Sequence, residues 1–228
     1  MTTQNTTNQA TNTTNNTTEL VFILDKSGSM SGMEKDTIGG FNSMIEKQKQ
    51  VEGKAYVSTV LFSSRSEVLH DRKDLSEIAP LAKEDYQVGG MTALLDAIGG
   101  AIKHISNVHT YIRPEDVPAR TIFVITTDGM ENMSREYSHS QIKKLIKEKE
   151  EKCGWEFIFL AANIDAGEVA ESIGISRGRA INYDVGEETT EMYEELSETL
   201  CCCRVMPMEE DIAAKFEARI KARKQNKK

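Results

Sequence analysis

Residues 20–29 read LVFILDKSGS, and this stretch decides the fold. Its first half is an uninterrupted apolar run, which predicts a strand buried on both faces of a parallel sheet. Asp25 follows at the carboxyl end of that strand, and hydroxyl groups come two and four residues later, at Ser27 and Ser29. Gly28 allows a sharp turn, so we expect the three side chains to face one point. Oxygen ligands of this kind suit Mg²⁺, Mn²⁺ or Ca²⁺ better than zinc or copper.

Two further segments complete a candidate metal site. Residues 89–96 read GGMTALLD and place Thr92 after a glycine pair, at the start of a helical pattern. Residues 121–129 read TIFVITTDG, a β-branched run that ends at Asp128 and a glycine. Ligand sites of open parallel sheets lie in the crevice outside the carboxyl ends of the strands. We therefore expect one crevice to hold Asp25 and Asp128, with Thr92 reaching in from its loop.

The chain resembles the von Willebrand factor A family in three motifs that occur in the family's order, DKSGSM, GGMTALLDAIG and ITTDGMEN. The resemblance covers roughly residues 19–185, and GWEFIFLAANID at 154–165 is similar to small stand-alone bacterial and phage members. The family's metal ion-dependent adhesion site consists of Asp-x-Ser-x-Ser, a threonine on a later loop and an aspartate after a central strand. The resemblance implies that the metal ligands here are Asp25, Ser27, Ser29, Thr92 and Asp128.

The hydrophobic pattern alternates between strands and helices. We expect strands at 20–24, 55–62, 66–70, 120–127, 155–160 and 180–183. Helices are expected at 34–50, directly after Thr92, after a capping box of Ser138 and Gln141, and at 166–173. The short turn between 55–62 and 66–70 predicts a hairpin whose second strand is antiparallel at the sheet edge. The predicted class is α/β, a doubly wound, mostly parallel, Rossmann-like sheet with one antiparallel edge strand and helices on both faces.

Three segments differ in composition. Residues 1–18 are almost wholly Thr, Asn and Gln, which predicts a disordered tail, with recognition of a partner as the alternative. Residues 19–185 form the expected domain. Residues 186–228 begin with an acidic segment carrying an apolar stripe and end in a basic tail. We expect a helix packed on the sheet and a solvated extension; the alternative is that the tail docks on the acidic helix or on an acidic partner.

Bulk composition bounds the function. The 228 residues, 39% apolar and 28% charged, predict one globular core. The net charge of −8 argues against nucleic acid as the main partner. No apolar run approaches the ~20 residues of a membrane span, and no secretory signal is visible. The four cysteines, Cys153 and three consecutive ones at 201–203, do not resemble a disulfide framework, and the three in a row cannot converge on one zinc ion. We expect a cytoplasmic protein.

The resemblance implies a module, not an enzyme, that binds a divalent cation and through it an Asp or Glu of a partner protein. It also implies a switch in which Thr92 does or does not contact the metal. One alternative is a metal-dependent hydrolase of phosphate or carboxylate substrates using Asp25 and Asp128. Others are a scaffold subunit with a structural metal, a site that needs no metal, and plain turn roles for the motif residues. No phosphate-binding P-loop motif is present. None of the four histidines lies in a recognisable sequence motif for a catalytic general base: His70, His104, His109 and His139.

Overall fold

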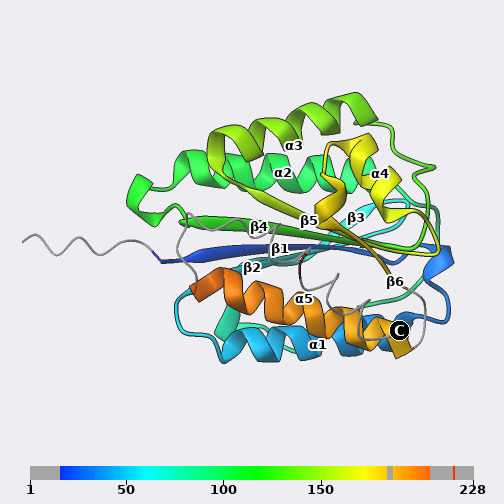
Figure 1. Ribbon diagram of the computed structural model, residues 1–228, viewed down its shortest axis with the longest axis horizontal. Coiled ribbons are helices and arrows are strands. Elements are labelled where there is room, and N and C mark those ends of the chain that lie inside the picture. The colour runs from blue at the N-terminus through cyan, green and yellow to red at the C-terminus, as the bar shows by residue number, and fades with distance from the viewer. Residues whose placement is uncertain (1–15, 184–186, 206–217, 219–228) are drawn as a thin grey trace, which may run out of the picture.

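A six-stranded sheet forms the centre of the protein in a computed structural model that describes residues 16–183, 187–205 and 218 (Figure 1). The spatial order of the strands is β3-β2-β1-β4-β5-β6. β3 pairs antiparallel with β2 at one edge, and the other neighbours pair in parallel. The predicted fold class and its antiparallel edge strand are confirmed. The strands are β1 (Thr18–Asp25), β2 (Ala55–Phe62), β3 (Ser66–Asp74), β4 (Arg120–Thr127), β5 (Glu156–Ala162) and β6 (Ala180–Tyr183).

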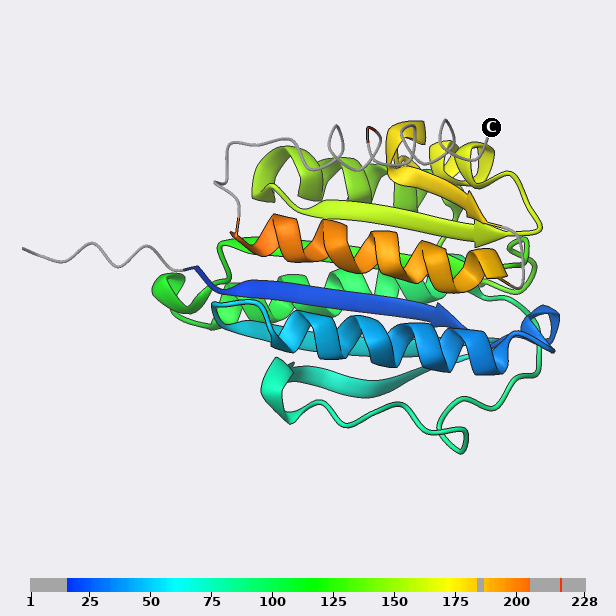
Figure 2. The same cartoon turned by 60° about the horizontal axis from the view of Figure 1, so that its bottom comes forward.

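Helices cover both faces of the sheet. Within the described residues these are α1 (Glu34–Lys49), α2 (Leu94–Tyr111), α3 (His139–Cys153), α4 (Ala166–Ile173) and α5 (Glu187–Val205). α2, α3 and α4 lie on one face, and α1 and α5 lie side by side on the other (Figures 1 and 2). α3 begins with the predicted capping box of Ser138 and Gln141, and α4 ends at Gly174, whose φ is 99°. Short 3₁₀ turns occupy Gly28–Met30, Leu75–Glu77, Pro114–Asp116 and Arg177–Arg179.

The buried side chains form one hydrophobic cluster on each face of the sheet. Alternate residues of β1 divide between them: Phe22 faces the cluster that includes α1 and α5, and Val21 and Ile23 face α2 and its neighbours. Every residue of β1 is buried. Because both faces of the strand pack against apolar clusters, its central residues 20–24 form a continuous apolar run and do not alternate.

The link between β3 and α2 is irregular apart from one 3₁₀ turn, and no element was expected there. Its side chains Leu75, Ile78, Leu81 and Tyr86 are buried in the cluster on the α1 side. The Tyr86 hydroxyl donates a hydrogen bond to the backbone carbonyl of Asp25. The link thus covers part of the sheet and supports the end of β1.

The structure describes only part of the expected N-terminal tail and of the expected C-terminal segment. β1 begins at Thr18, one residue inside the segment expected to be a disordered tail, while residues 1–15 lie outside the described residues. The helix expected after residue 186 is α5, which buries Leu196 and Leu200 in the core. The basic tail, except Ala218, also lies outside the described residues. In the part of the chain that is described, no helix is both long and apolar enough to span a bilayer.

The contact between α1 and α5 depends on a glycine. A Cβ atom on Gly40 would lie 2.1 Å from Cδ2 of the buried Tyr193 ring, whereas a Cβ on the neighbouring Gly39 meets nothing within 4 Å. The two helices can therefore approach closely only where α1 has no side chain.

We expect Gly40→Ala to lower the free energy of unfolding by about 1–3 kcal/mol, because the added methyl group forces the Tyr193 ring to move. Gly39→Ala is the matched control and should raise the free energy of unfolding by roughly 0.5–1 kcal/mol, because alanine has the higher helix propensity. Chemical denaturation of both variants measures the difference. Equal effects would contradict the close approach.

Candidate metal centre

Three loops meet at the carboxyl edge of the sheet, at the right of Figure 1. The first follows β1, the second precedes α2, and the third follows β4. Backbone hydrogen bonds join the first two: Gly28 donates to the carbonyl of Gly90 at 3.0 Å, and Gly89 donates to that of Lys26 at 2.8 Å. Two of the expected segments are therefore joined at the carboxyl ends of the strands.

The Asp25 side chain is 0% exposed, and both of its carboxylate oxygens are oriented by hydrogen bonds. Oδ1 accepts from the backbone N–H of Ser27 at 2.7 Å, and Oδ2 accepts from the hydroxyl of Thr127 at 2.5 Å. Burial nevertheless raises the pKa of Asp25, and the nearby charge of Asp128 adds to the effect. An uncompensated negative charge is thus costly at this position.

Two serine hydroxyls connect Asp25's turn to the other carboxylate. Ser27 Oγ lies 3.1 Å from Ser29 Oγ, and Ser29 Oγ donates to Oδ1 of Asp128 at 2.6 Å. Asp128 is itself buried, and this burial raises its pKa despite the hydrogen bond from Ser29. The two serine hydroxyls therefore link the turn that holds Asp25 to the carboxylate of Asp128.

Thr92 reaches the same place from the second loop. The side chain is buried, and its backbone forms two hydrogen bonds with Asn132: the Thr92 N–H donates to Oδ1 at 2.9 Å, and the Thr92 carbonyl accepts from the Asn132 N–H at 3.0 Å. A Cβ atom on Gly129 would lie 3.0 Å from Ser29 Oγ and 3.2 Å from Thr92 Oγ1. Both hydroxyls thus border one small space. The structure brings together all of the sequence-predicted site residues.

The third loop is fastened to the first turn of α2 by two acidic residues that sequence reasoning missed. Glu131 accepts from the N–H groups of Leu95 (2.9 Å) and Met133 (2.8 Å). It also accepts from the N–H of Ser134 at 2.6 Å and from the Ser134 hydroxyl at 2.7 Å. Burial opposes the charge of Glu131, but these hydrogen bonds outweigh it and lower its pKa. Glu131 therefore positions the segment that carries Asp128 against the helix that follows Thr92.

Asp96 fastens the same loop further along. Its carboxylate accepts hydrogen bonds from three consecutive backbone N–H groups, at 2.9, 2.9 and 3.0 Å, from Arg135, Glu136 and Tyr137. The sequence contains a signal for this role, an acidic residue in the first turn of an expected helix, but nothing in the sequence indicates which loop it binds.

The donor set fits a hard divalent cation. Two carboxylates and three hydroxyls supply only oxygen, the ligand type that Mg²⁺, Mn²⁺ and Ca²⁺ prefer. Among the described residues, no three His, Cys, Asp or Glu side chains are grouped to bind a metal on their own. Burial raises the pKa of both Asp25 and Asp128, so a nearby positive charge would favour their ionised forms.

The histidines are occupied elsewhere or exposed. His70 Nδ1 lies 3.1 Å from the Thr59 hydroxyl. His104 pairs with Asp71, and His109 contacts the buried Glu19 near the start of β1, at the opposite end of the sheet. His139 is exposed at the start of α3.

Gly129→Ala is expected to weaken metal affinity by at least about tenfold, because the methyl group would enter the space between the Ser29 and Thr92 hydroxyls. A tenfold loss corresponds to about 1.4 kcal/mol. Gly100→Ala, where a Cβ meets nothing within 4 Å, is the control and should bind metal as the wild type does. Calorimetric titration with Mg²⁺ or Mn²⁺ measures both. Unchanged affinity in Gly129→Ala would place the metal elsewhere.

Asp128→Asn should raise the thermal stability of the metal-free protein at neutral pH. Because the pKa of Asp128 is higher in the folded than in the unfolded chain, protonation stabilises the fold at low pH. That stabilisation is lost as the pH rises from about 3.8, the ordinary pKa of an aspartate, through the raised pKa of Asp128 in the folded protein. The amide mimics the protonated form and keeps an acceptor for Ser29. Unfolding temperatures in chelator across this range test the sign, and a less stable Asp128→Asn protein at neutral pH would contradict it.

Comparison with known proteins agrees with this architecture. No curated protein matches the chain by sequence. Proximal thread matrix protein 1 from the mussel byssus superposes with a TM-score of 0.56 at 14% identity, over 81% of this chain and 46% of that one. One structure of that protein has a zinc-occupied MIDAS motif, where MIDAS stands for the metal ion-dependent adhesion site. The ArnB paralog VWA2 from Sulfolobus acidocaldarius superposes with a TM-score of 0.52 at 17% identity, over 82% of this chain and 45% of that one.

A third solved structure, a von Willebrand factor type A protein from Catenulispora acidiphila, gives a TM-score of 0.51 at 13% identity, over 80% of this chain and 42% of that one. The chain thus spans less than half the length of these structural relatives, and identities this low show the fold alone. The family model of the von Willebrand factor type A domain matches residues 19–196, most of the chain. The chain belongs to the von Willebrand factor type A domain family.

Proposed function

We propose that the chain binds a divalent cation and, through it, an acidic residue of a partner protein. Domains of this family are generally metal-dependent protein-interaction modules. The observation that carries the proposal is the meeting of two carboxylates and three hydroxyls from three separate loops in one crevice. The proposed ligands are Asp25, Ser27, Ser29, Thr92 and Asp128.

The charge of this ligand set explains why the partner should be acidic. The hydroxyls are neutral, so Asp25 and Asp128 are the charged members of the proposed ligand set. A bound Mg²⁺ supplies a positive centre that a further carboxylate oxygen can approach. The residues of the chain hold their positions through protein contacts: Asp25 through Ser27 N–H and Thr127, and Thr92 through Asn132. In a crevice that excludes part of the water, a charge-assisted contact with Asp or Glu is strengthened.

We propose Mg²⁺ as the ion, with Mn²⁺ and Ca²⁺ as the other hard cations that suit these oxygens. The mussel protein with zinc in its MIDAS motif makes zinc a further ion to test.

A binding module, and not an enzyme, is supported by the surroundings of the centre. His70, His104 and His109 each contact a side chain outside it, and His139 is exposed at the start of α3. The proposed cytoplasmic location is supported by the four cysteines, which form no disulfide bond with one another and of which Cys153 is exposed. We further propose that the chain is akin to small stand-alone bacterial and phage members of the family.

Thermal unfolding tests the metal site directly. At a hundredfold excess over Kd, a cation that binds only the folded protein should stabilise it by about 2.7 kcal/mol. The increase should appear with Mg²⁺ or Mn²⁺, disappear with chelator, and be absent in Asp25→Ala. Asp116→Ala, which removes an exposed carboxylate paired with Arg113, is the control and should keep the increase.

The result that overturns the proposal is equally clear. If no cation raises the unfolding temperature of the wild type and calorimetry detects no binding, the metal-bridged function fails. If metal stabilises the protein but peptides carrying Glu or Asp never bind in a metal-dependent way, the ion is structural and the partner part fails.

A further inference from the structure

Large apolar side chains are exposed beside the metal centre. Five such side chains occur among the described residues: Val68, Met91, Tyr111, Met130 and Val205. Met91 (47% exposed) immediately precedes Thr92, and Met130 (69% exposed) follows Asp128 by two residues. Scattered exposed apolar residues are ordinary, but two of them flank one site here. Methionine is flexible and polarisable, which suits it to contact with varied apolar surfaces.

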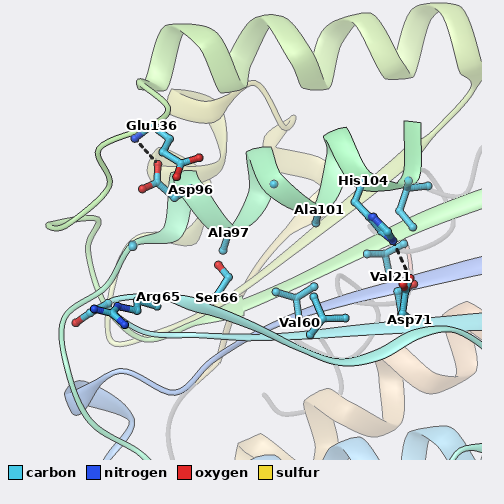
Figure 3. Close-up of a pocket in the computed structure, with 16 residues that line it drawn as sticks. Val21, Val60, Arg65, Ser66, Asp71, Asp96, Ala97, Ala101, His104 and Glu136 are labelled. Atoms are coloured by element: carbon cyan, nitrogen blue, oxygen red, sulfur yellow. Dashed lines mark hydrogen bonds and ion pairs between the residues drawn. The ribbon is translucent and has the colours of Figure 1, made fainter. Parts of the chain in front are cut away.

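A groove begins next to the same loop. It has a volume of about 470 Å³ and lies between α2 and the β2–β3 hairpin (Figure 3). Its helix side includes four small residues, Ala93, Ala97, Gly100 and Ala101, together with the larger Asp96, His104 and Ile105. The four small residues leave part of the space between α2 and the edge of the sheet unfilled. The volume falls in the range of about 300–1,000 Å³ typical of ligand sites.

The floor and the hairpin wall of the groove combine apolar side chains and hydroxyls with the charged side chains of Arg65 and Asp71. Val21, Val60 and Val68 contribute the apolar side chains, and Ser58 and Ser66 contribute the hydroxyls. Val68 is 57% exposed, so a third exposed apolar side chain borders this surface. The apolar part of these walls suits an apolar side chain from a partner.

The groove and the metal centre share a wall. The hydroxyl of Ser64, which lines the groove, accepts the backbone N–H of Met91 at 2.8 Å, and the N–H of Ala93 donates to the carbonyl of Ser63 at 2.9 Å. Thr92 lies between these two contacts. At the other end, the hydrogen bond of 2.7 Å between His104 and Asp71 spans from α2 to β3 (Figure 3). The groove therefore leads away from the metal centre along α2.

We infer that the metal centre, Met91, Met130 and the groove form one continuous surface for a partner segment that carries an Asp or Glu within a few residues of large apolar side chains. The carboxylate is directed to the metal, and the apolar side chains pack on the methionines and enter the groove. This inference rests on the proposed function and specifies the partner's chemistry: an acidic residue alone does not use the surface, and an apolar peptide without the acid does not reach the metal.

The test uses displayed random peptides with one fixed glutamate at the centre, and a matched library with glutamine there. Three variants of the full chain are compared with the wild type. Met91→Ser/Met130→Ser removes the apolar flank, and Val68→Lys places a charge at the groove. Tyr111→Ser, at the far end of α2 and 88% exposed, is the matched control for losing an exposed apolar residue. Metal-induced stabilisation of every variant verifies that the fold and the metal site are intact.

The glutamate library should be retained in Mg²⁺ and released by chelator, and the selected peptides should be enriched in Leu, Ile, Met and Phe near the glutamate. The Kd of a selected peptide should rise at least about tenfold in the double serine variant and in Val68→Lys, about 1.4 kcal/mol, and stay unchanged in Tyr111→Ser. Glutamate-dependent, chelator-sensitive binding without apolar enrichment would overturn this inference and leave the proposed function standing. No glutamate-dependent retention by a metal-loaded wild type would overturn both.

Discussion

The fully buried carboxylate of Asp25 is the constraint around which the site is built. A buried charge is costly unless its oxygens are hydrogen-bonded, and the fold supplies one donor for each: the turn after β1 through Ser27, and the neighbouring strand β4 through Thr127. These contacts fix the side chain but do not supply positive charge, and its pKa stays raised. Burial also raises the pKa of Asp128, which accepts a hydrogen bond from Ser29, so both carboxylates lie where a nearby positive charge would favour their ionised forms.

Much of the fold could be predicted because its signals are local. A continuous apolar run identifies β1, the Ser138–Gln141 capping box identifies the start of α3, and Gly174 identifies the end of α4. The grouping of the candidate ligands also followed from a local rule, since each lies near the carboxyl end of a parallel strand or in a loop beside one. The motif therefore carried both the architecture and the position of the site.

The parts that escaped prediction depend on pairs of residues distant in sequence. Tyr86 supports the Asp25 carbonyl from a link without periodicity, and Asn132 holds the backbone of Thr92 from a loop forty residues away. A glycine is required at position 40 only because the Tyr193 ring packs against it from α5. Hydrophobic periodicity describes one element at a time, so it contains no information about which polar side chain reaches which backbone group. Such positioning residues need the tertiary structure.

The loop that carries Thr92 links the metal centre to the groove. Ser63 and Ser64 hold this loop from the hairpin side, and Asn132 holds it from the loop that carries Asp128. A partner side chain is proposed to lie in the groove, which Ser64 and Ala93 of these contacts line, and the metal is proposed to bind the hydroxyl of Thr92. Binding free energies at coupled sites are reciprocal. Any factor by which metal raises the affinity of the groove for a partner is therefore the factor by which the partner raises the affinity for metal, so the two ligands are expected to be retained together.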